Sequence, residues 1–447
     1  MKIDRRDFIR VAGSSGLTLL CGTPGWAKGI PGSQTDPSSV SLPSPDASGI
    51  QHVVVVTMEN RSFDHLLGWL PNANAQQNFT YPTASNGTFT TEHWPDYQGC
   101  GHLEPDHSYS GGRIQYDNGK MDGWLLDTNN DIFAIGYYNE SDLPFTSSLA
   151  RNFTTLDNYF CAILGPTFPN RIFMLAAQTD RLADTLPFTN LPTIFDRLAQ
   201  ARIKARYYYS NVPFLALWGL KYLLISRTYD DFLSDAASGR LPAVSFVDPR
   251  FTLLDDDTGN DDHPHSSIQR GESFLAQTFN AVASGPAWSS TVFVVTFDEW
   301  GGFFEHMPPQ RVVAPNNVDT DMVGGRVLLG FRVPTIVASP WTLNTNPSSP
   351  VVNSTLFDHT SILKLIEWRW SVNPLTARDA SSELGNLAAT LDFTNPNPQP
   401  PFLPQPPPPP SSPCFLQDIL AIRRMQSPLT TWSYLKLSAK AWGWPVK

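Results

Sequence analysis

Charged side chains are scarce in this sequence: they make up 16% of its 447 residues, and acidic residues outnumber basic ones by 41 to 31. A net charge of −10 repels the phosphate backbone of nucleic acids, so we expect no nucleic-acid partner. A chain this acidic that binds an anionic ligand needs a cation to neutralise it locally. Hydrophobic residues, at 41%, suffice for the buried core of a globular protein.

Cysteine is rarer still, with four residues in the chain. Cys21 lies in an expected export signal, which leaves Cys100, Cys161 and Cys414. Three cysteines allow at most one disulfide, and the sequence does not decide which pair forms it. No two of them lie within four residues of each other, which argues against a zinc cluster built from cysteines.

The N-terminal apolar stretch, residues 11–21, is too short to span a bilayer. It follows the pair Arg5 and Arg6 and precedes the small residues around Ala27. Paired arginines, a short apolar run and a cleavage site, in this order, are typical of a twin-arginine export signal. We therefore predict a signal peptide at 1–27, read by the twin-arginine translocation machinery, and a periplasmic or secreted protein.

Proline is abundant, at 40 residues, and it marks the expected boundaries of the chain. A Ser/Pro-rich tether is predicted at 28–47, before a single large domain at 48–394. Residues 395–413 form a proline-rich linker, because five consecutive prolines at 406–410 favour an extended chain. The remaining residues, 414–447, are predicted to be a helical extension that packs back on the domain.

Apolar runs rich in β-branched residues alternate with helical patterns along the domain. Strands are predicted at 52–58, 241–247, 291–297 and 333–338, and helices at 193–199, 267–283 and 360–370. Continuous apolar runs are typical of strands that are buried on both faces of a parallel sheet. The pattern predicts an α/β fold: a three-layer sandwich with a mainly parallel central sheet and helices on both faces.

Polar residues follow two of the predicted strands directly. Glu59 and Asn60 come after the first strand, and Asp298 and Glu299 come after the strand at 291–297. Sites in open α/β sheets form at the carboxyl ends of strands. Carboxylate and amide oxygens suit a hard divalent cation such as Mg²⁺, Ca²⁺ or Mn²⁺. Acidic residues in these positions also cap helices, but two such motifs together favour a metal site.

Thr167 and a small set of histidines complete the candidate site. Thr167 begins a predicted helix, where backbone N–H groups favour an anion and where threonine often serves as the N-cap. A nearby metal would make its hydroxyl a usable nucleophile. The sequence has nine histidines, and His107, His263 and His265 lie in loops beside aspartates. Imidazoles near a phosphoryl group can neutralise charge or protonate a leaving oxygen.

The stretch from His52 to His65 resembles the opening signature of bacterial phosphoesterases that include non-haemolytic phospholipase C and a secreted acid phosphatase. Further motifs of that family follow in the same order, at 119–124, 165–171, 262–264, 296–309 and 357–368. The resemblance implies an alkaline-phosphatase-like fold and a catalytic domain at 48–394. It also implies an exported phosphoric ester hydrolase, most simply a phospholipase C acting on phosphatidylcholine-type diesters.

The resemblance also assigns roles to the candidate residues. It implies that Thr167 is the nucleophile and forms a phosphothreonine intermediate while a histidine assists departure of the alcohol. The implied metal ligands are Glu59, Asn60, Asp298 and Glu299, and the implied groups around the phosphate are Asn170, His107, His263 and His265. The family loop has a second proline where this chain has His265, so either His263 or His265 can face the substrate.

Two other interpretations remain open from the sequence, and a third is excluded. An acid phosphatase would act on phosphomonoesters, and the short proline-rich C-terminus favours it somewhat over a phospholipase with transient membrane-surface contact. A non-catalytic exported binding protein on the same fold would have lost the nucleophile or a metal ligand, and neither loss is visible. A sulfatase requires a Cys/Ser-x-Pro-x-Arg motif, and the residues after Cys161 do not provide it.

Overall fold

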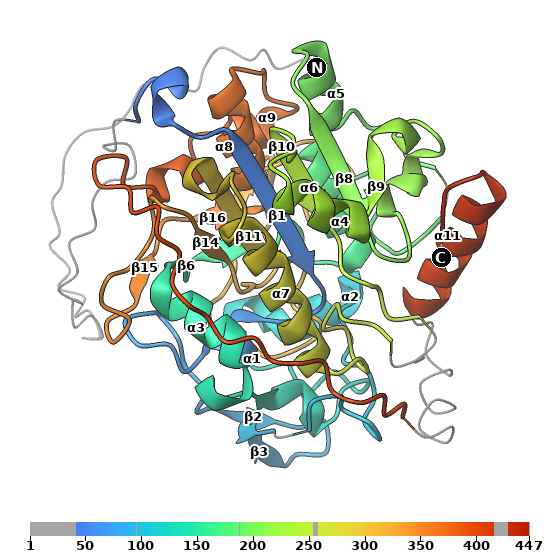
Figure 1. Cartoon of the computed structure of the whole chain (residues 1–447). Coiled ribbons are helices and arrows are strands. Elements are labelled where there is room, and N and C mark those ends of the chain that lie inside the picture. The colour runs from blue at the N-terminus through green and yellow to red at the C-terminus, as the bar shows by residue number, and fades with distance from the viewer. Residues whose placement is uncertain (1–41, 95, 187, 254–257, 415–427, 447) are drawn as a thin grey trace, which may run out of the picture. The chain divides into compact units, whose positions relative to one another are not determined.

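The computed structural model describes residues 42–94, 96–186, 188–253, 258–414 and 428–446 (Figure 1). These residues belong to one compact unit, Val40–Lys447. The predicted signal peptide and most of the predicted tether lie outside the described residues. No helix in the described ranges is long and apolar enough to cross a membrane.

A central eight-stranded sheet organises the described chain (Figure 1). Its strands, in spatial order, are β15 (Val351–Asn353), β6 (Thr154–Leu156), β14 (Ile336–Ala338), β11 (Thr291–Phe297), β1 (His52–Met58), β10 (Val244–Val247), β8 (Ala205–Tyr209) and β9 (Ser226–Thr228). Within this sheet β14 alone runs antiparallel to its neighbours. The predicted mainly parallel α/β fold is therefore confirmed.

Four two-stranded sheets lie outside the central one. They pair β2 (Thr80–Pro82) with β3 (Thr88–Thr90), β4 (Glu92–His93) with β5 (Gly136–Tyr137), β7 (Tyr159–Phe160) with β16 (Phe357–Asp358), and β12 (Arg311–Val313) with β13 (Arg326–Leu328). The helices are α1 (Phe63–Leu67), α2 (Tyr109–Tyr116), α3 (Pro144–Asn152), α4 (Thr167–Ala176), α5 (Ile194–Gln200), α6 (Tyr229–Ala237), α7 (Ile268–Ala283), α8 (His359–Trp370), α9 (Ala377–Ala380) and α11 (Pro428–Ala441).

Helices cover both faces of the central sheet, as the alternation of side chains along its strands requires. On one face Phe293 of β11 meets Phe279 of α7, with ring centroids 5.6 Å apart. On the other face Phe246 of β10 meets Phe195 of α5, at 5.5 Å. Helices α3 and α6 pack beside α7, whereas α4 and α8 pack on the side of α5. The core is thus two apolar layers on either side of the sheet.

The strands and helices predicted from the sequence are all present, although two strands begin later than expected. The run at 241–247 becomes a strand only at Val244, and the run at 333–338 only at Ile336. Pro242 and Pro334 lie in the missing parts. Proline has no N–H to donate to the sheet, so it shortens each strand from its N-terminal side.

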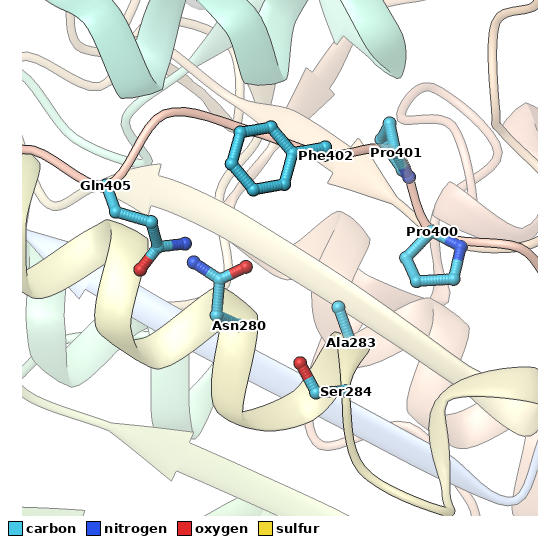
Figure 2. Close-up of a pocket in the computed structure, with 7 residues that line it drawn as sticks. All are labelled: Asn280, Ala283, Ser284, Pro400, Pro401, Phe402 and Gln405. Atoms are coloured by element: carbon cyan, nitrogen blue, oxygen red, sulfur yellow. The ribbon is translucent and has the colours of Figure 1, made fainter.

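The segment 395–414 has no helix or strand and runs past α7 as an extended strap. Figure 2 shows a hollow between this strap and α7, lined by Asn280, Ala283, Ser284, Pro400, Pro401, Phe402 and Gln405. None of these side chains is titratable, so the hollow offers no acid, base or nucleophile. The strap ends at Cys414, which forms a disulfide with Cys100, and Cys161 is a free, buried thiol.

Candidate active site

The carboxyl ends of β1 and β11 bring four predicted metal ligands together. The two strands are parallel neighbours, with Met58 opposite Phe297, so the residues that follow them meet at one edge of the sheet. Glu59 and Asn60 follow β1, and Asp298 and Glu299 follow β11; all four are fully buried. The Asn60 backbone N–H donates to Asp298 Oδ1 at 3.1 Å, which joins the two strand ends directly.

A glycine allows this close approach. Asn60 has a φ of 59°, in the left-handed region that asparagine tolerates better than most residues. Gly301 has a φ of 66°, and a Cβ there would lie 2.1 Å from the Asn60 carbonyl oxygen. A side chain at residue 301 would therefore push the two strand ends, and the four carboxylate and amide groups on them, apart.

The chemistry of these residues fits a divalent cation. Both carboxylate oxygens of Glu59 and Oε1 of Glu299 are buried without a hydrogen-bond partner. Burial raises the pKa of Glu59 and of Glu299 well above the ordinary value, and the neighbouring Asp298 carboxylate raises both further. A nearby positive charge would stabilise the ionised form of these buried carboxylates, and oxygen ligands suit Mg²⁺, Ca²⁺ or Mn²⁺.

Arg171 supplies part of that positive charge, and the sequence interpretation did not include it among the site residues. Its Nε lies 2.8 Å from Asp298 Oδ2 and 3.2 Å from Glu59 Oε1, and its Nη1 lies 3.0 Å from Asp248 Oδ1. The signal available in the sequence was its spacing: Arg171 is four residues after Thr167, hence on the same face of α4.

Thr167 is the first residue of α4 and is fully buried. Pro166 occupies the N-cap position, so Thr167 does not cap the helix. Its hydroxyl instead lies 3.5 Å from Asn60 Oδ1, at the edge of hydrogen-bonding distance. A hydroxyl that points at a candidate metal ligand, rather than at the helix backbone, is placed as a nucleophile would be.

Asn170 is placed differently from the prediction. Its Nδ2 donates to the carbonyl oxygens of Ile163, Gly165 and Pro166, and its Oδ1 accepts from the Ile163 N–H at 3.1 Å. These bonds use the whole amide to hold the loop before Thr167. The structure therefore places the Asn170 amide against the loop before Thr167, where it supports the candidate nucleophile.

His107 joins the predicted metal ligands to the histidine loops. Its Nδ1 lies 3.0 Å from the Pro105 carbonyl oxygen, so Nδ1 carries the proton and Nε2 can accept. Nε2 lies 3.5 Å from Asn60 Nδ2 and 3.9 Å from Glu299 Oε1. The imidazole thus lies beside two of the predicted metal ligands.

Glu104 is a second site residue that sequence reasoning missed. Its Oε1 lies 3.2 Å from His263 Nε2 and 3.7 Å from His107 Nε2, and all three side chains are buried. Burial alone would lower the pKa of His263, but the Glu104 and Asp261 carboxylates raise it to about 9. Burial would raise the pKa of Glu104, but the histidines lower it to about 2. His263 is thus held as a cation.

His265, the other predicted histidine of this loop, is turned elsewhere. It is buried, and its Nε2 donates to the His102 carbonyl oxygen at 3.0 Å. Of the two, His263 is the histidine that contacts the carboxylate beside the metal ligands.

His359 contacts the backbone of a predicted metal ligand. It is the first residue of α8, and its Nε2 donates to the Asp298 carbonyl oxygen at 2.7 Å. Burial lowers its pKa to about 4, so it is neutral and serves as a hydrogen-bond donor.

Two groups in the described part of the chain have the spacing of metal ligands: Glu104, His107 and His263, and a second group of Asp64, Glu305 and His306. In the second group the Arg332 guanidinium already lies 2.7 Å from Glu305 and 3.3 Å from Asp64. A resident arginine satisfies those charges, so we interpret the second group as a structural ion network.

Changing Glu104 to glutamine tests its effect on His263. The amide keeps the shape of the side chain but removes the charge, so burial should lower the pKa of His263. If His263 acts as an acid, the alkaline limb of the kcat/KM profile should then move down by about one pH unit or more. A matched control is Asp131→Asn. It removes the carboxylate charge from another histidine pair, Asp131 and His102 at 3.0 Å, which is not part of the candidate site, so the alkaline limb should not move. An alkaline limb that stays in place in Glu104→Gln would contradict this role.

The arrangement defines a class of enzyme: a threonine hydroxyl, buried carboxylates and a cationic imidazole at one edge of an α/β sheet suit a hydrolase of phosphoric esters. The chain belongs to the phosphoesterase family, because the model of the Phosphoesterase family matches residues 50–373. The match includes every candidate site residue named from the sequence. The protein is thus a phosphoric ester hydrolase.

Individual relatives agree with this assignment. The chain is 33% identical to non-specific phospholipase C6 of Arabidopsis thaliana over 375 residues, which cover 74% of this chain and 71% of that protein. It is 30% identical to phospholipase C B of Mycobacterium tuberculosis over 442 residues, which cover 80% of each. Among solved structures, a protein in the alkaline phosphatase superfamily from Vibrio parahaemolyticus is similar at 10% identity and a TM-score of 0.35. The match covers 75% of this chain and 69% of the chain of that protein.

Proposed function

We propose that this phosphoesterase is a metal-dependent phospholipase C that hydrolyses phosphatidylcholine-type phosphodiesters through a phosphothreonine intermediate. The observation that carries the proposal is the position of Thr167, whose buried hydroxyl lies 3.5 Å from Asn60 Oδ1. Relatives named phospholipase C, at about 30% identity over most of both chains, support a lipid phosphodiester as the substrate.

In the proposed reaction, the Thr167 oxygen forms a bond to phosphorus and the bond from phosphorus to the glycerol oxygen breaks. Diacylglycerol leaves with a proton, which His263 can donate because Glu104 keeps it protonated. Water then forms a bond to phosphorus, the bond to Thr167 breaks, and the phosphorylated head group leaves. The proton that this water releases restores the imidazolium, and the Thr167 oxygen takes back from solvent the proton that it lost to solvent when it attacked phosphorus.

The proposed cofactor is one hard divalent cation, Ca²⁺, Mg²⁺ or Mn²⁺, held by Glu59, Asn60, Asp298 and Glu299. When bound, it neutralises charge on the phosphate and lowers the pKa of the threonine hydroxyl. His107 lies beside two of these ligands and can orient the phosphate, while Arg171 holds Glu59 and Asp298 in place.

We also propose export through the twin-arginine machinery to the periplasm or beyond, followed by transient contact with a membrane surface. The Arg5–Arg6 pair supports export, and the Cys100–Cys414 disulfide is of the kind that persists in oxidising compartments. A phospholipid substrate in a bilayer requires the contact with membrane.

The test compares two soluble esters. Full-length protein of defined metal content is assayed on p-nitrophenylphosphorylcholine, a diester, and on p-nitrophenyl phosphate, a monoester, each with and without chelator. Chelator-sensitive hydrolysis of the diester with little release from the monoester is the expected result. The reverse preference would make the protein an acid phosphatase, and no turnover with metal bound would favour the binding-protein interpretation.

A further inference from the structure

The C-terminal helix α11 reaches the active site, although it lies beyond the family match, which ends at residue 373. Its Trp432 is fully buried. The indole stacks on Phe251, with ring centroids 4.0 Å apart and an interplanar angle of 19°, and meets Phe168 edge-on at 5.1 Å. Phe168 directly follows Thr167, so α11 packs against the start of the helix that carries the candidate nucleophile.

Phe251 and Trp432 also pack against one face of the Arg171 guanidinium. The Arg171 guanidinium lies over the Phe251 ring at 4.7 Å from its centroid and 5.9 Å from the Trp432 ring. Its polar edge faces the other way, toward Asp298 and Glu59. The guanidinium is therefore held between two aromatic rings on one side and two candidate metal ligands on the other.

A second contact joins α11 to the nucleophile helix. The Thr431 hydroxyl donates to the Asp184 carbonyl oxygen at 3.3 Å. The Asp184 carboxylate in turn accepts a hydrogen bond of 2.7 Å from the backbone N–H of Phe168, the residue that follows Thr167. Two adjacent residues of α11 thus touch the surroundings of Thr167 and of Arg171.

We propose that Trp432 is a positioning residue of the active site, which fixes Arg171 through Phe251 and thereby sets the spacing of Glu59 and Asp298. The inference rests on the proposed metal-dependent function. A cavity in place of the indole leaves Phe251 without its stacking partner, and the long Arg171 side chain can then move into the space. The carboxylates of Glu59 and Asp298 repel each other. Without the Arg171 guanidinium between them, their separation would no longer be fixed.

The test uses metal-stripped full-length protein with Trp432→Leu, Trp432→Ala and Trp432→Phe. We expect the dissociation constant for Mn²⁺, measured by calorimetry, to rise about tenfold or more in the leucine and alanine variants. On p-nitrophenylphosphorylcholine, kcat should fall by a similar factor while KM changes less than about threefold. Phenylalanine should retain both values, because it keeps the stacked ring and Trp432 Nε1 makes no hydrogen bond to any residue that the structure describes.

Tyr434→Ala is the matched control, because Tyr434 lies on the outer face of α11 and is 57% exposed. It should leave the Mn²⁺ dissociation constant, kcat and Tm unchanged. The leucine variant loses the stacked ring but leaves a smaller cavity than alanine, so it remains informative if the alanine variant does not fold.

A Trp432 variant that has a lower Tm but binds Mn²⁺ and turns over diester within twofold of the unmodified protein would overturn the proposal. Unmodified protein that binds Mn²⁺ without hydrolysing either ester would refute the proposed function instead. The Mn²⁺ affinities of the variants would still decide the role of Trp432 in that case.

Discussion

Thr167→Ala is expected to lower kcat on p-nitrophenylphosphorylcholine by about 10³-fold or more, because it removes the oxygen that attacks phosphorus in the first step of the proposed reaction. Stability should change little. The Thr167 hydroxyl makes one long hydrogen bond, 3.5 Å to Asn60 Oδ1, and Pro166 rather than Thr167 is in the N-cap position of α4. Steady-state kinetics and a thermal melt of the same preparation measure both effects.

Thr167→Ser is the companion variant, because it keeps a hydroxyl at the same position and should retain part of the activity. Rapid denaturation of the unmodified enzyme during turnover of p-nitrophenylphosphorylcholine should trap the phosphorylcholine group on the peptide that contains Thr167. An alanine variant that keeps a tenth or more of the original kcat would show that another group attacks phosphorus.

Glu299→Gln is expected to have opposite effects on metal binding and on the stability of the metal-free protein. Its Oε1 has no hydrogen-bond partner, and burial together with Asp298 raises its pKa, so its charge is unfavourable when no cation is bound. Removing that charge should raise the Tm of chelated protein by about 2 °C. The same change removes a proposed ligand, so Mn²⁺ affinity should fall about 100-fold and activity with it.

Glu272→Gln provides the contrast for this experiment. Glu272 is also a buried carboxylate, but the Phe145 and Thr146 backbone N–H groups and the Thr146 hydroxyl all donate to it. Glutamine would place an NH2 group where an oxygen now accepts these hydrogen bonds, so the change should lower Tm and leave Mn²⁺ affinity unchanged. A Glu299→Gln protein that binds Mn²⁺ normally would exclude Glu299 from the metal site.

The parts of the fold that could be predicted are those in which local composition decides the structure. The β-branched run from His52 to Met58 is β1, buried from Val53 onward and paired in parallel on both sides. The direction of β14 could not be predicted, because an apolar run of three residues looks the same in either orientation. Its antiparallel pairing with β11 follows from the route of the chain between them.

The residues of the candidate site also fall into those that the sequence could predict and those that it could not. Glu59, Asn60, Asp298 and Glu299 could be placed together because each pair directly follows a strand, and parallel strands end at one edge of the sheet. Glu104 lies in a loop with no periodic pattern. The sole sequence signal for it was its spacing of three residues from His107, and only the folded loop shows that it also meets His263.

The contacts of Trp432 and the pairing of the disulfide could not be predicted, for a related reason. Contacts between residues far apart in sequence depend on the path of the whole chain, and Cys100 and Cys414 are 314 residues apart. The three cysteines outside the predicted signal allowed three pairings, and the folded chain selects this one. Cys161 is buried and remains a thiol.

The bond between Cys100 and Cys414 turns most of the enzyme into a closed ring. Thr167, His263 and Glu299 all lie on the stretch that the bond encloses, so a protease that cuts one loop in this stretch leaves two fragments joined through sulfur. The bond also ties the loop of Glu104 to a residue that is made much later. A chain cut short before residue 414 would therefore lack this covalent anchor beside the active site.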